Sequence, residues 1–170
     1  MAQLKRFMAC IALSAFAVTA LAQSQVFTSD KVDYSIELPT STWRVIAEPD
    51  AAHQHVEFVY GDRLEGYLEI RKEALETGGT LEDVVRQDQE QRLRYLPGFV
   101  EGKGEHFAGR LNGMTSSYEY VKNGKPMMGR IYYLQADNRT IYALRFSALR
   151  DKLLRIRNQT DAIARSFKLK

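Results

Sequence analysis

Cysteine is almost absent from the sequence: Cys10 is the only one among 170 residues. A disulfide joins two cysteines, and structural zinc sites commonly use several cysteine thiolates. Cys10 also lies within an N-terminal apolar segment that we expect to be removed from the mature protein. The mature chain is therefore expected to contain no disulfide, no thiol nucleophile and no cysteine-ligated metal, so its hydrophobic core must stabilise it.

The sequence also lacks a large excess of charge of either sign, with 24 Lys and Arg residues against 21 Asp and Glu. Removal of the N-terminal segment takes away Lys5 and Arg6, which brings the balance close to neutral. Proteins that bind nucleic acid generally carry a basic surface that neutralises phosphates. We therefore expect no nucleic-acid partner.

Common catalytic motifs are missing as well. The sequence contains no G-x-S-x-G, no H-E-x-x-H and no P-loop. No residue pattern marks a nucleophile with an activating base beside it. We therefore expect a protein that is not an enzyme and that needs no cofactor.

The N-terminus has the pattern of a secretory signal peptide. Lys5 and Arg6 precede an apolar run from Phe7 to Ala20, and Ala20-Leu21-Ala22 is a small-x-small cleavage pattern. The run is shorter than the roughly 20 apolar residues that a spanning helix needs. We expect residues 1–22 to be cleaved, which predicts a periplasmic or secreted protein without a stable membrane anchor.

The remaining sequence predicts a short leader followed by one α+β domain. Residues 23–30 are mostly polar and are expected to form a flexible leader, with a single domain over residues 31–170. In the second half, alternation of apolar and polar residues predicts a meander of four strands. Asn112-Gly113, Asn123-Gly124 and Asp137-Asn138 separate these strands and suit two-residue hairpin turns, because Asn, Asp and Gly tolerate positive φ.

Two helices are predicted beside these strands. The first begins after Thr80, a suitable N-cap with Asp83 at the capping-box position, and ends before Pro97-Gly98. Its middle is polar on every face, so we expect the helix to pack by its ends and to expose Gln87 to Gln91. The second helix, over about 149–166, has an apolar stripe with three- and four-residue spacing.

The order of these motifs resembles that of PsbP-like proteins. The chain has the strand "YSIELP", a strand that begins with tryptophan, a hairpin, a helix ending in "LPG", a long meander and a final helix running into "IARSFKL". The resemblance implies an antiparallel sheet with helices packed on both faces, an α/β/α sandwich. It also implies a non-enzymatic role in binding or assembly. Proteins of this type include extrinsic subunits of photosystems. The sequence matches none of the functional motifs of those subunits, so the resemblance implies no site residue.

The segment "HQHVEF" is a candidate metal site. In a strand, His53, His55 and Glu57 lie on one face, and imidazole and carboxylate ligands suit zinc, copper or nickel. Pairing of this strand with the next one would bring Glu73 opposite His55. The candidate ligands are therefore His53, His55, Glu57 and Glu73.

The same pairing also explains these residues without a metal. It places Arg71 opposite Glu57, which would form an ordinary cross-strand ion pair, and lets Glu73 accept a hydrogen bond from His55. Arg71 would also repel a metal cation. A solvent-facing strand surface and a metal site therefore both remain open interpretations.

The meander contains a second candidate site. If each turn has two residues, Arg130 lies opposite Arg145, and two facing guanidinium groups repel each other unless an anion lies between them. That anion is either Glu119, in a network with His106, or a bound carboxylate or phosphate. The candidate anion-binding residues are Arg130, Arg145, Glu119, His106 and Tyr132.

These observations favour an exported, non-enzymatic binding or assembly-accessory protein of unassigned specificity. The expected partner is a protein of the cell envelope, bound through the exposed helix centre or the sheet edges. Binding of a small anion by Arg130 and Arg145, and binding of a divalent metal by His53 and His55, are the alternative functions.

Overall fold

The computed structural model describes residues 24–51 and 55–170. The predicted signal peptide (residues 1–22), Cys10 within it, and His53 lie outside the described residues. Within the described part, no helix is both long enough and apolar enough to cross a membrane.

The protein is built on an antiparallel sheet of seven strands in the order β3-β4-β5-β9-β8-β7-β6. These strands are β3 (Trp43–Ala47), β4 (His55–Tyr60), β5 (Asp62–Ala74), β6 (Val100–Phe107), β7 (Gly113–Lys122), β8 (Lys125–Gln135) and β9 (Thr140–Leu149). A second sheet contains β1 (Gln25–Thr28), β2 (Tyr34–Leu38) and β10 (Lys168–Leu169) in the order β1-β2-β10.

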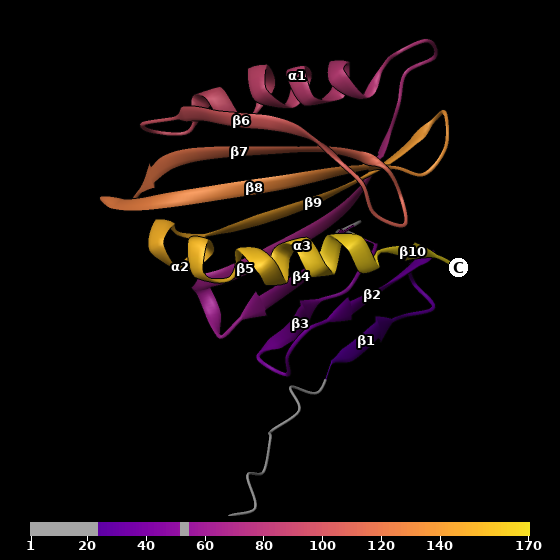
Figure 1. Ribbon diagram of the computed structural model, residues 1–170, viewed down its shortest axis with the longest axis horizontal. Helices are drawn as coiled ribbons and strands as arrows, with labels where there is room; N and C mark the ends of the chain where they lie inside the picture. Colours follow the sequence, from indigo (N-terminus) through magenta and orange to yellow (C-terminus); the bar gives the residue numbers. More distant parts are fainter. Residues whose placement is uncertain (1–23, 52–54) are drawn as a thin grey trace, which may run out of the picture.

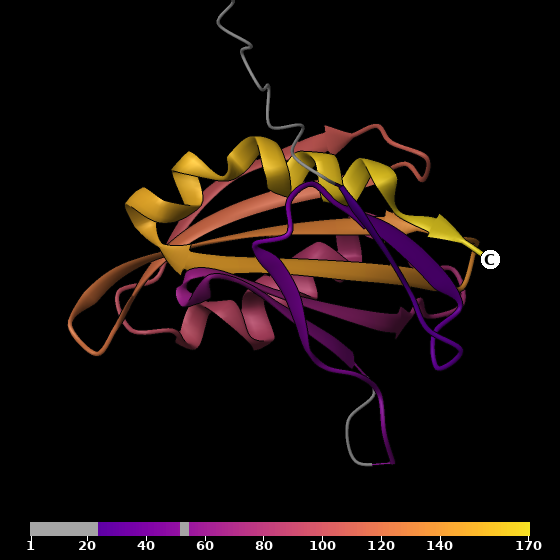
Figure 2. The ribbon, with the colours of Figure 1, turned by 90° about the horizontal axis from the view of Figure 1, so that it is seen from below.

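Helices cover both faces of the main sheet (Figure 1). The helical elements are α1 (Leu81–Gln91), the 3-10 turn η1 (Leu93–Tyr95), α2 (Arg150–Arg155) and α3 (Arg157–Ser166). Helix α1 lies on one face, whereas α2, α3 and the small sheet lie on the other, as the view from below also shows (Figure 2). This arrangement confirms the predicted α+β sandwich.

A separate core fills each side of the main sheet. Strand β8 contributes to both, because Ile131 and Tyr133 pack beneath α1 while Tyr132 and Leu134 pack on the side of α3. All four are completely buried. A strand covered on both faces must be apolar at consecutive positions, and this explains the run "IYYL".

The turns of the meander confirm one prediction and correct two. Asn123 and Gly124 form the expected two-residue turn, with φ angles of 52° and 72°, between the paired residues Lys122 and Lys125. The turn at Asn112-Gly113 was predicted wrongly, because Gly113 already pairs with Phe107. Five residues therefore separate β6 from β7.

The turn at Asp137-Asn138 is one residue longer than predicted. The Ala136 N–H donates a 2.9 Å hydrogen bond to the Thr140 carbonyl oxygen, so residues 137–139 form a three-residue turn. Within it, the Asp137 carboxylate accepts a hydrogen bond from the backbone N–H of Arg139 at 2.7 Å. An aspartate side chain that accepts a hydrogen bond from the backbone two residues later stabilises such a turn. Because side chains alternate between faces, the extra residue turns every side chain of β9 to the face opposite the predicted one.

Both ends of the described chain differ from expectation. Residues 25–28, predicted to lie in a flexible leader, form β1, which pairs with β2 and packs Phe27 edge-on against Phe58 at 4.9 Å. The single helix predicted over 149–166 is divided at Ile156 into α2 and α3. The chain then continues into β10, which pairs with β2.

Helix α1 begins as predicted but packs differently. The capping box between Thr80 and Asp83 is present. The centre of the helix, however, is not wholly exposed, because Asp88 is 4% exposed. Its carboxylate accepts hydrogen bonds from the Arg145 guanidinium and from the Tyr133 hydroxyl, both at 2.5 Å. A buried carboxylate is tolerated when it is paired and hydrogen-bonded, and periodicity alone does not reveal such a pair.

Replacement of Asp88 by alanine should therefore destabilise the protein strongly. Arg145, with a side chain only 14% exposed, would keep a buried charge without its closest partner. Loss of one member of a buried ion pair costs about 3–5 kcal/mol of unfolding free energy. Urea unfolding followed by circular dichroism measures this loss. The matched control is Glu90→Ala on the exposed side of α1, expected to change stability by less than about 0.5 kcal/mol; equal effects of the two variants would contradict the assignment.

Candidate functional site

The two arginines of the predicted anion site lie on opposite faces of the main sheet. Arg130 pairs with Phe146, and Arg145 pairs with Ile131. Arg145 points towards α1 and binds Asp88, whereas Arg130 points towards α3, where its Nη2 lies 3.4 Å from Asp161 Oδ1. The prediction that these arginines face each other is therefore wrong, and its cause is the longer turn after β8.

The other residues of that predicted site are also separated. His106 pairs with Met114 and is exposed, not opposite Glu119 as expected. Glu119 forms an ion pair with Arg150 at 3.2 Å. Tyr132 lies beside Arg130 and accepts a 2.7 Å hydrogen bond from its Nε. Of the five predicted residues, the structure brings together only Arg130 and Tyr132.

Tyr132 connects that arginine to α3. Its hydroxyl donates a hydrogen bond to Asp161 and lies 3.0 Å from the hydroxyl of Thr160. Burial, together with the hydrogen bond to Asp161, raises the pKa of Tyr132 to about 12. Tyr132 is therefore a neutral hydrogen-bonding residue at physiological pH.

The histidine strand retains its predicted faces in a different register. His55 lies opposite Arg71, and Glu57 lies opposite Glu69. The predicted partners Glu73 and Arg71 are each displaced by two residues, because β5 begins directly after a tight turn at Gly61, which has a φ of 67°. A shift of two residues does not exchange faces, so the division into buried and polar sides remains correct.

Three potential metal ligands meet on this polar side. One ligand atom each from His55, Glu57 and Glu69 lies within 4.8 Å of the other two. Glu69 was not among the predicted ligands, because the tight turn that Gly61 permits moves the partner of Glu57 from Arg71 to Glu69. Glu73, which was predicted as a ligand, instead lies 3.0 Å from Arg92 and 3.8 Å from Arg145.

The charges within this cluster are arranged in pairs. His55 Nε2 lies 3.0 Å from Glu57 and 4.0 Å from Glu69, and each of the three side chains is 15% exposed. Arg63 binds Glu57 at 2.7 Å, while Arg71 donates from Nε and Nη2 to Glu69. Two carboxylates directly across a strand pair repel each other, so the cluster requires nearby cations.

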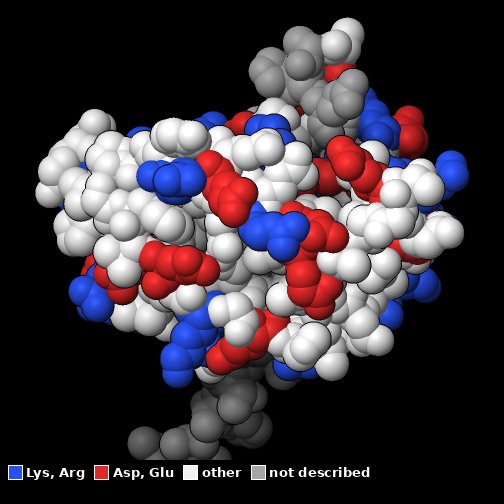
Figure 3. All heavy atoms as spheres, turned by 90° about the horizontal axis from the view of Figure 1, so that it is seen from above, with Lys and Arg blue, Asp and Glu red and all other residues white. Residues whose placement is uncertain are grey.

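The pKa of Glu57 reflects this environment. Burial opposes its ionisation, but hydrogen bonds from His55 and Tyr67 and the charge of Arg63 outweigh burial and lower the pKa of Glu57. The cluster lies on the face of the sheet that carries α1. Figure 3 shows that side chains of both charges are interspersed over this face.

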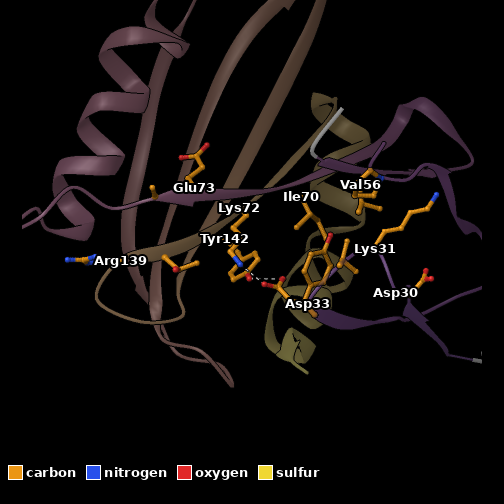
Figure 4. A pocket seen from close by; sticks show the side chains of 14 residues that line it. Asp30, Lys31, Asp33, Val56, Ile70, Lys72, Glu73, Arg139 and Tyr142 are labelled. Carbon is orange, nitrogen blue, oxygen red and sulfur yellow. Dashed lines mark hydrogen bonds and ion pairs between the residues drawn. The ribbon is translucent and has the colours of Figure 1, made fainter. Parts of the chain in front are cut away.

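A hollow lies on the opposite face of the main sheet from α1, between the β1–β2 loop and strands β5 and β9. It has a volume of about 700 Å³, and Val56 and Ile70 supply part of its apolar lining. Figure 4 shows Lys72 and Tyr142 converging on Asp33, whose carboxylate accepts a 2.7 Å hydrogen bond from the Tyr142 hydroxyl. Burial raises the pKa of Asp33, but the hydrogen bonds from Lys72 and Tyr142 lower it overall. These polar groups therefore satisfy one another.

No protein-family model and no curated protein matches the sequence. Solved structures, in contrast, show clear similarity. Cyanobacterial PsbP (CyanoP) from Synechocystis sp. PCC 6803 has 15% identity and a TM-score of 0.60, with 93% of this chain and 99% of that chain covered.

Two further similar structures come from a bacterium and a yeast. LpqN from Mycobacterium tuberculosis, involved in cell envelope biogenesis, has 19% identity and a TM-score of 0.57, with 87% of this chain and 91% of that chain covered. The Ran-binding protein Mog1p of Saccharomyces cerevisiae has 7% identity and a TM-score of 0.61, with 87% and 96% covered. At these identities the comparison establishes the fold, and the chain has a PsbP-like fold.

Proposed function

We propose that this chain is an exported, non-enzymatic binding protein that holds a protein partner of the cell envelope along the free edge of β3. The observation that carries this proposal is the difference between the two edges of the main sheet. At the β3 edge, Val45 and Ile46 are 41% and 43% exposed. At the β6 edge, Glu101, Lys103 and Glu105 are exposed and the pairing is irregular between Glu101 and Gly104.

Charged residues and irregular pairing protect an edge strand against the addition of another strand. The β6 edge carries exposed charges at Glu101, Lys103 and Glu105 beside the exposed Val100. Strand β3 also has an irregularity, between Val45 and Ala47, but it has one charged residue, Arg44, beside the exposed apolar Val45 and Ile46. Within residues 24–51 and 55–170, β3 pairs only with β4, so no strand covers its other edge, where the Trp43 N–H donates to the Thr40 carbonyl oxygen at 3.2 Å. A partner in an extended conformation could form main-chain hydrogen bonds along this edge.

Side chains of such a partner could pack into a hollow between β1 and β3. A hollow of about 300 Å³ lies between β1 and β3 and is lined by residues that include Val26 and Phe27 from β1 and Trp43 and Val45 from β3. Val26 is 66% exposed. Main-chain pairing with apolar pockets for alternate side chains is the usual geometry of strand addition.

Two observations support a role in the cell envelope. The N-terminal sequence has the signal-peptide pattern described above, with a cleavage pattern at Ala20 and Ala22. LpqN, which has the same fold, is involved in cell envelope biogenesis. An exported protein without cysteine must rely on its core, and the two cores of this sandwich provide that stability.

Site-specific cross-linking tests the β3 edge. A photo-reactive amino acid placed at Ile46 in the full chain should give a discrete cross-linked partner in intact cells. Val45→Lys in the same protein should abolish that product, because a charged side chain blocks strand addition. The matched control is the reactive residue at Val100, which is 60% exposed on the β6 edge. Identical products from both positions, or products unaffected by Val45→Lys, would refute the proposed edge.

Export has its own test. The mature protein recovered from the periplasm or medium should begin at Gln23, as measured by intact mass. Ala22→Asp should block cleavage, because signal peptidase requires a small residue there, whereas Leu21→Ala should leave cleavage unchanged. Recovery of a protein that retains residues 1–22 in that fraction would contradict the predicted cleavage.

A divalent-cation site at His55, Glu57 and Glu69 is a second candidate function. The observation that favours it is the convergence of three ligand atoms within 4.8 Å on side chains that are largely buried. One imidazole and two carboxylates suit zinc. A bound cation would also relieve the repulsion between the two facing glutamates. It would have to replace the hydrogen bond between His55 and Glu57.

Calorimetric titration of the mature protein with zinc tests this candidate. The expected result is binding of one ion, at least about tenfold weaker in His55→Ala and Glu69→Gln because each loses a ligand. Glu73→Gln is the matched control, since Glu73 is on the same strand but is paired with Arg92. An absence of heat with the unmodified protein, or an equal loss in Glu73→Gln, would remove this candidate.

A further inference from the structure

A small hollow opens on the α3 side of the main sheet, near the β6 edge. It has a volume of about 260 Å³ and lies between strands β6, β7 and β8 and helices α2 and α3. Its lining residues are Lys103, Glu105, Ser117, Met128, Arg130, Leu153, Leu154, Arg157 and Thr160. None of these residues belongs to the β3 edge or to the His55 cluster.

Positive charge gathers around this hollow. Lys103, Arg130 and Arg157 line it, against a single carboxylate, that of Glu105. Arg130 is held in place by Tyr132 and Asp161, and its side chain is only 13% exposed. Among the residues that the structure describes, the side chains of Lys103 and Arg157 form no hydrogen bond or ion pair. Even with Asp161 included, one positive charge remains without a balancing carboxylate.

An irregularity in strand β6 places Lys103 beside the hollow. At Gly102 an added Cβ would lie 2.4 Å from Ser117 Oγ and 2.7 Å from the Ser117 carbonyl oxygen, so this position admits only glycine. The pairing of β6 with β7 is irregular between Glu101 and Gly104. This bulge contains Lys103 and brings it to the rim of the hollow, as bulges commonly redirect a side chain.

The rest of the lining is apolar or carries hydroxyl groups. Met128, Leu153 and Leu154 form an apolar wall, and Leu154 is 52% exposed although it is a large aliphatic residue. Ser117 and Thr160 also line the hollow, and their hydroxyl groups donate to the carbonyl oxygens of Lys103 and Arg157 at 3.4 and 2.8 Å. A guanidinium group recognises carboxylate and phosphate oxygens, whereas an apolar wall recognises hydrocarbon.

We infer that this hollow binds a small amphipathic anion, a carboxylate or phosphate group carried on a short apolar chain. The anionic group lies between Arg130, Arg157 and Lys103, and the apolar chain lies against Met128 and Leu154. The volume is slightly below the range of about 300–1,000 Å³ that is usual for drug-sized ligands, so the hollow takes a short chain. This site is separate from the protein-binding edge at β3.

Titration of the mature protein with hexyl phosphate, followed by NMR chemical shifts, tests the inference. Hexyl phosphate should bind at one site, more tightly than hexanol or inorganic phosphate, because each of these lacks one of the two recognised parts. Arg157→Gln and Lys103→Gln should each raise the dissociation constant about fivefold or more, because each removes one charge from the anion site. Arg155→Gln is the matched control and should leave the constant unchanged, because Arg155 is an exposed arginine two residues before Arg157 that pairs with Asp151 and does not line the hollow.

Two results would overturn the inference: no binding of hexyl phosphate, or binding that Arg157→Gln leaves unchanged. Vesicles containing phosphatidylglycerol distinguish the source of the anion. Retention on vesicles that is lost in Arg157→Gln would identify a lipid head group, whereas binding of hexyl phosphate without retention would identify a free amphiphile. Val45→Lys should bind hexyl phosphate normally, so failure at the β3 edge and failure at this hollow give different results.

Discussion

The buried ion pair between Asp88 and Arg145 joins helix α1 to strand β9 of the main sheet. It fixes the centre of α1 to β9, and it depends on the face to which Arg145 points. A one-residue slip of β9 would turn Arg145 towards α3 and leave Asp88 with only the more exposed Arg92, 3.5 Å away, as a cationic partner. The free-energy cost of separating a buried ion pair therefore opposes such a slip. The pair selects the register of the sheet as well as the position of the helix.

The same register determines where a ligand can be bound. Because α1 covers one face and α2, α3 and the small sheet cover the other, the central strands β8 and β9 are occupied by core residues such as Ile131, Tyr132 and Phe146. The proposed sites lie outside these two cores: the free edge of β3, the His55 cluster on β4 and β5, and the cationic hollow bordered by β6, β8 and α3.

The sequence predicts the fold better than it predicts the sites, for a physical reason. Alternation and turn residues identify strands without specifying how many residues each turn contains. At Asp137 one additional turn residue separated Arg130 from Arg145 by the thickness of the sheet. At Gly61 the error was two residues, so His55 and Glu57 kept their faces and only the partner changed, from Glu73 to Glu69. The buried role of Asp88 depends on a partner 57 residues away, which no local pattern reveals.

Folding does not explain the chemical character of the residues at these proposed sites. Val45 and Ile46 expose apolar surface, Glu57 and Glu69 place like charges opposite each other, and Arg157 extends a cation towards a hollow that already contains Arg130. Each feature departs from what stability and solubility alone favour, and such local departures concentrate at functional sites. The fold depends on the two cores, and these residues belong to neither core, so their chemistry can change without loss of the scaffold.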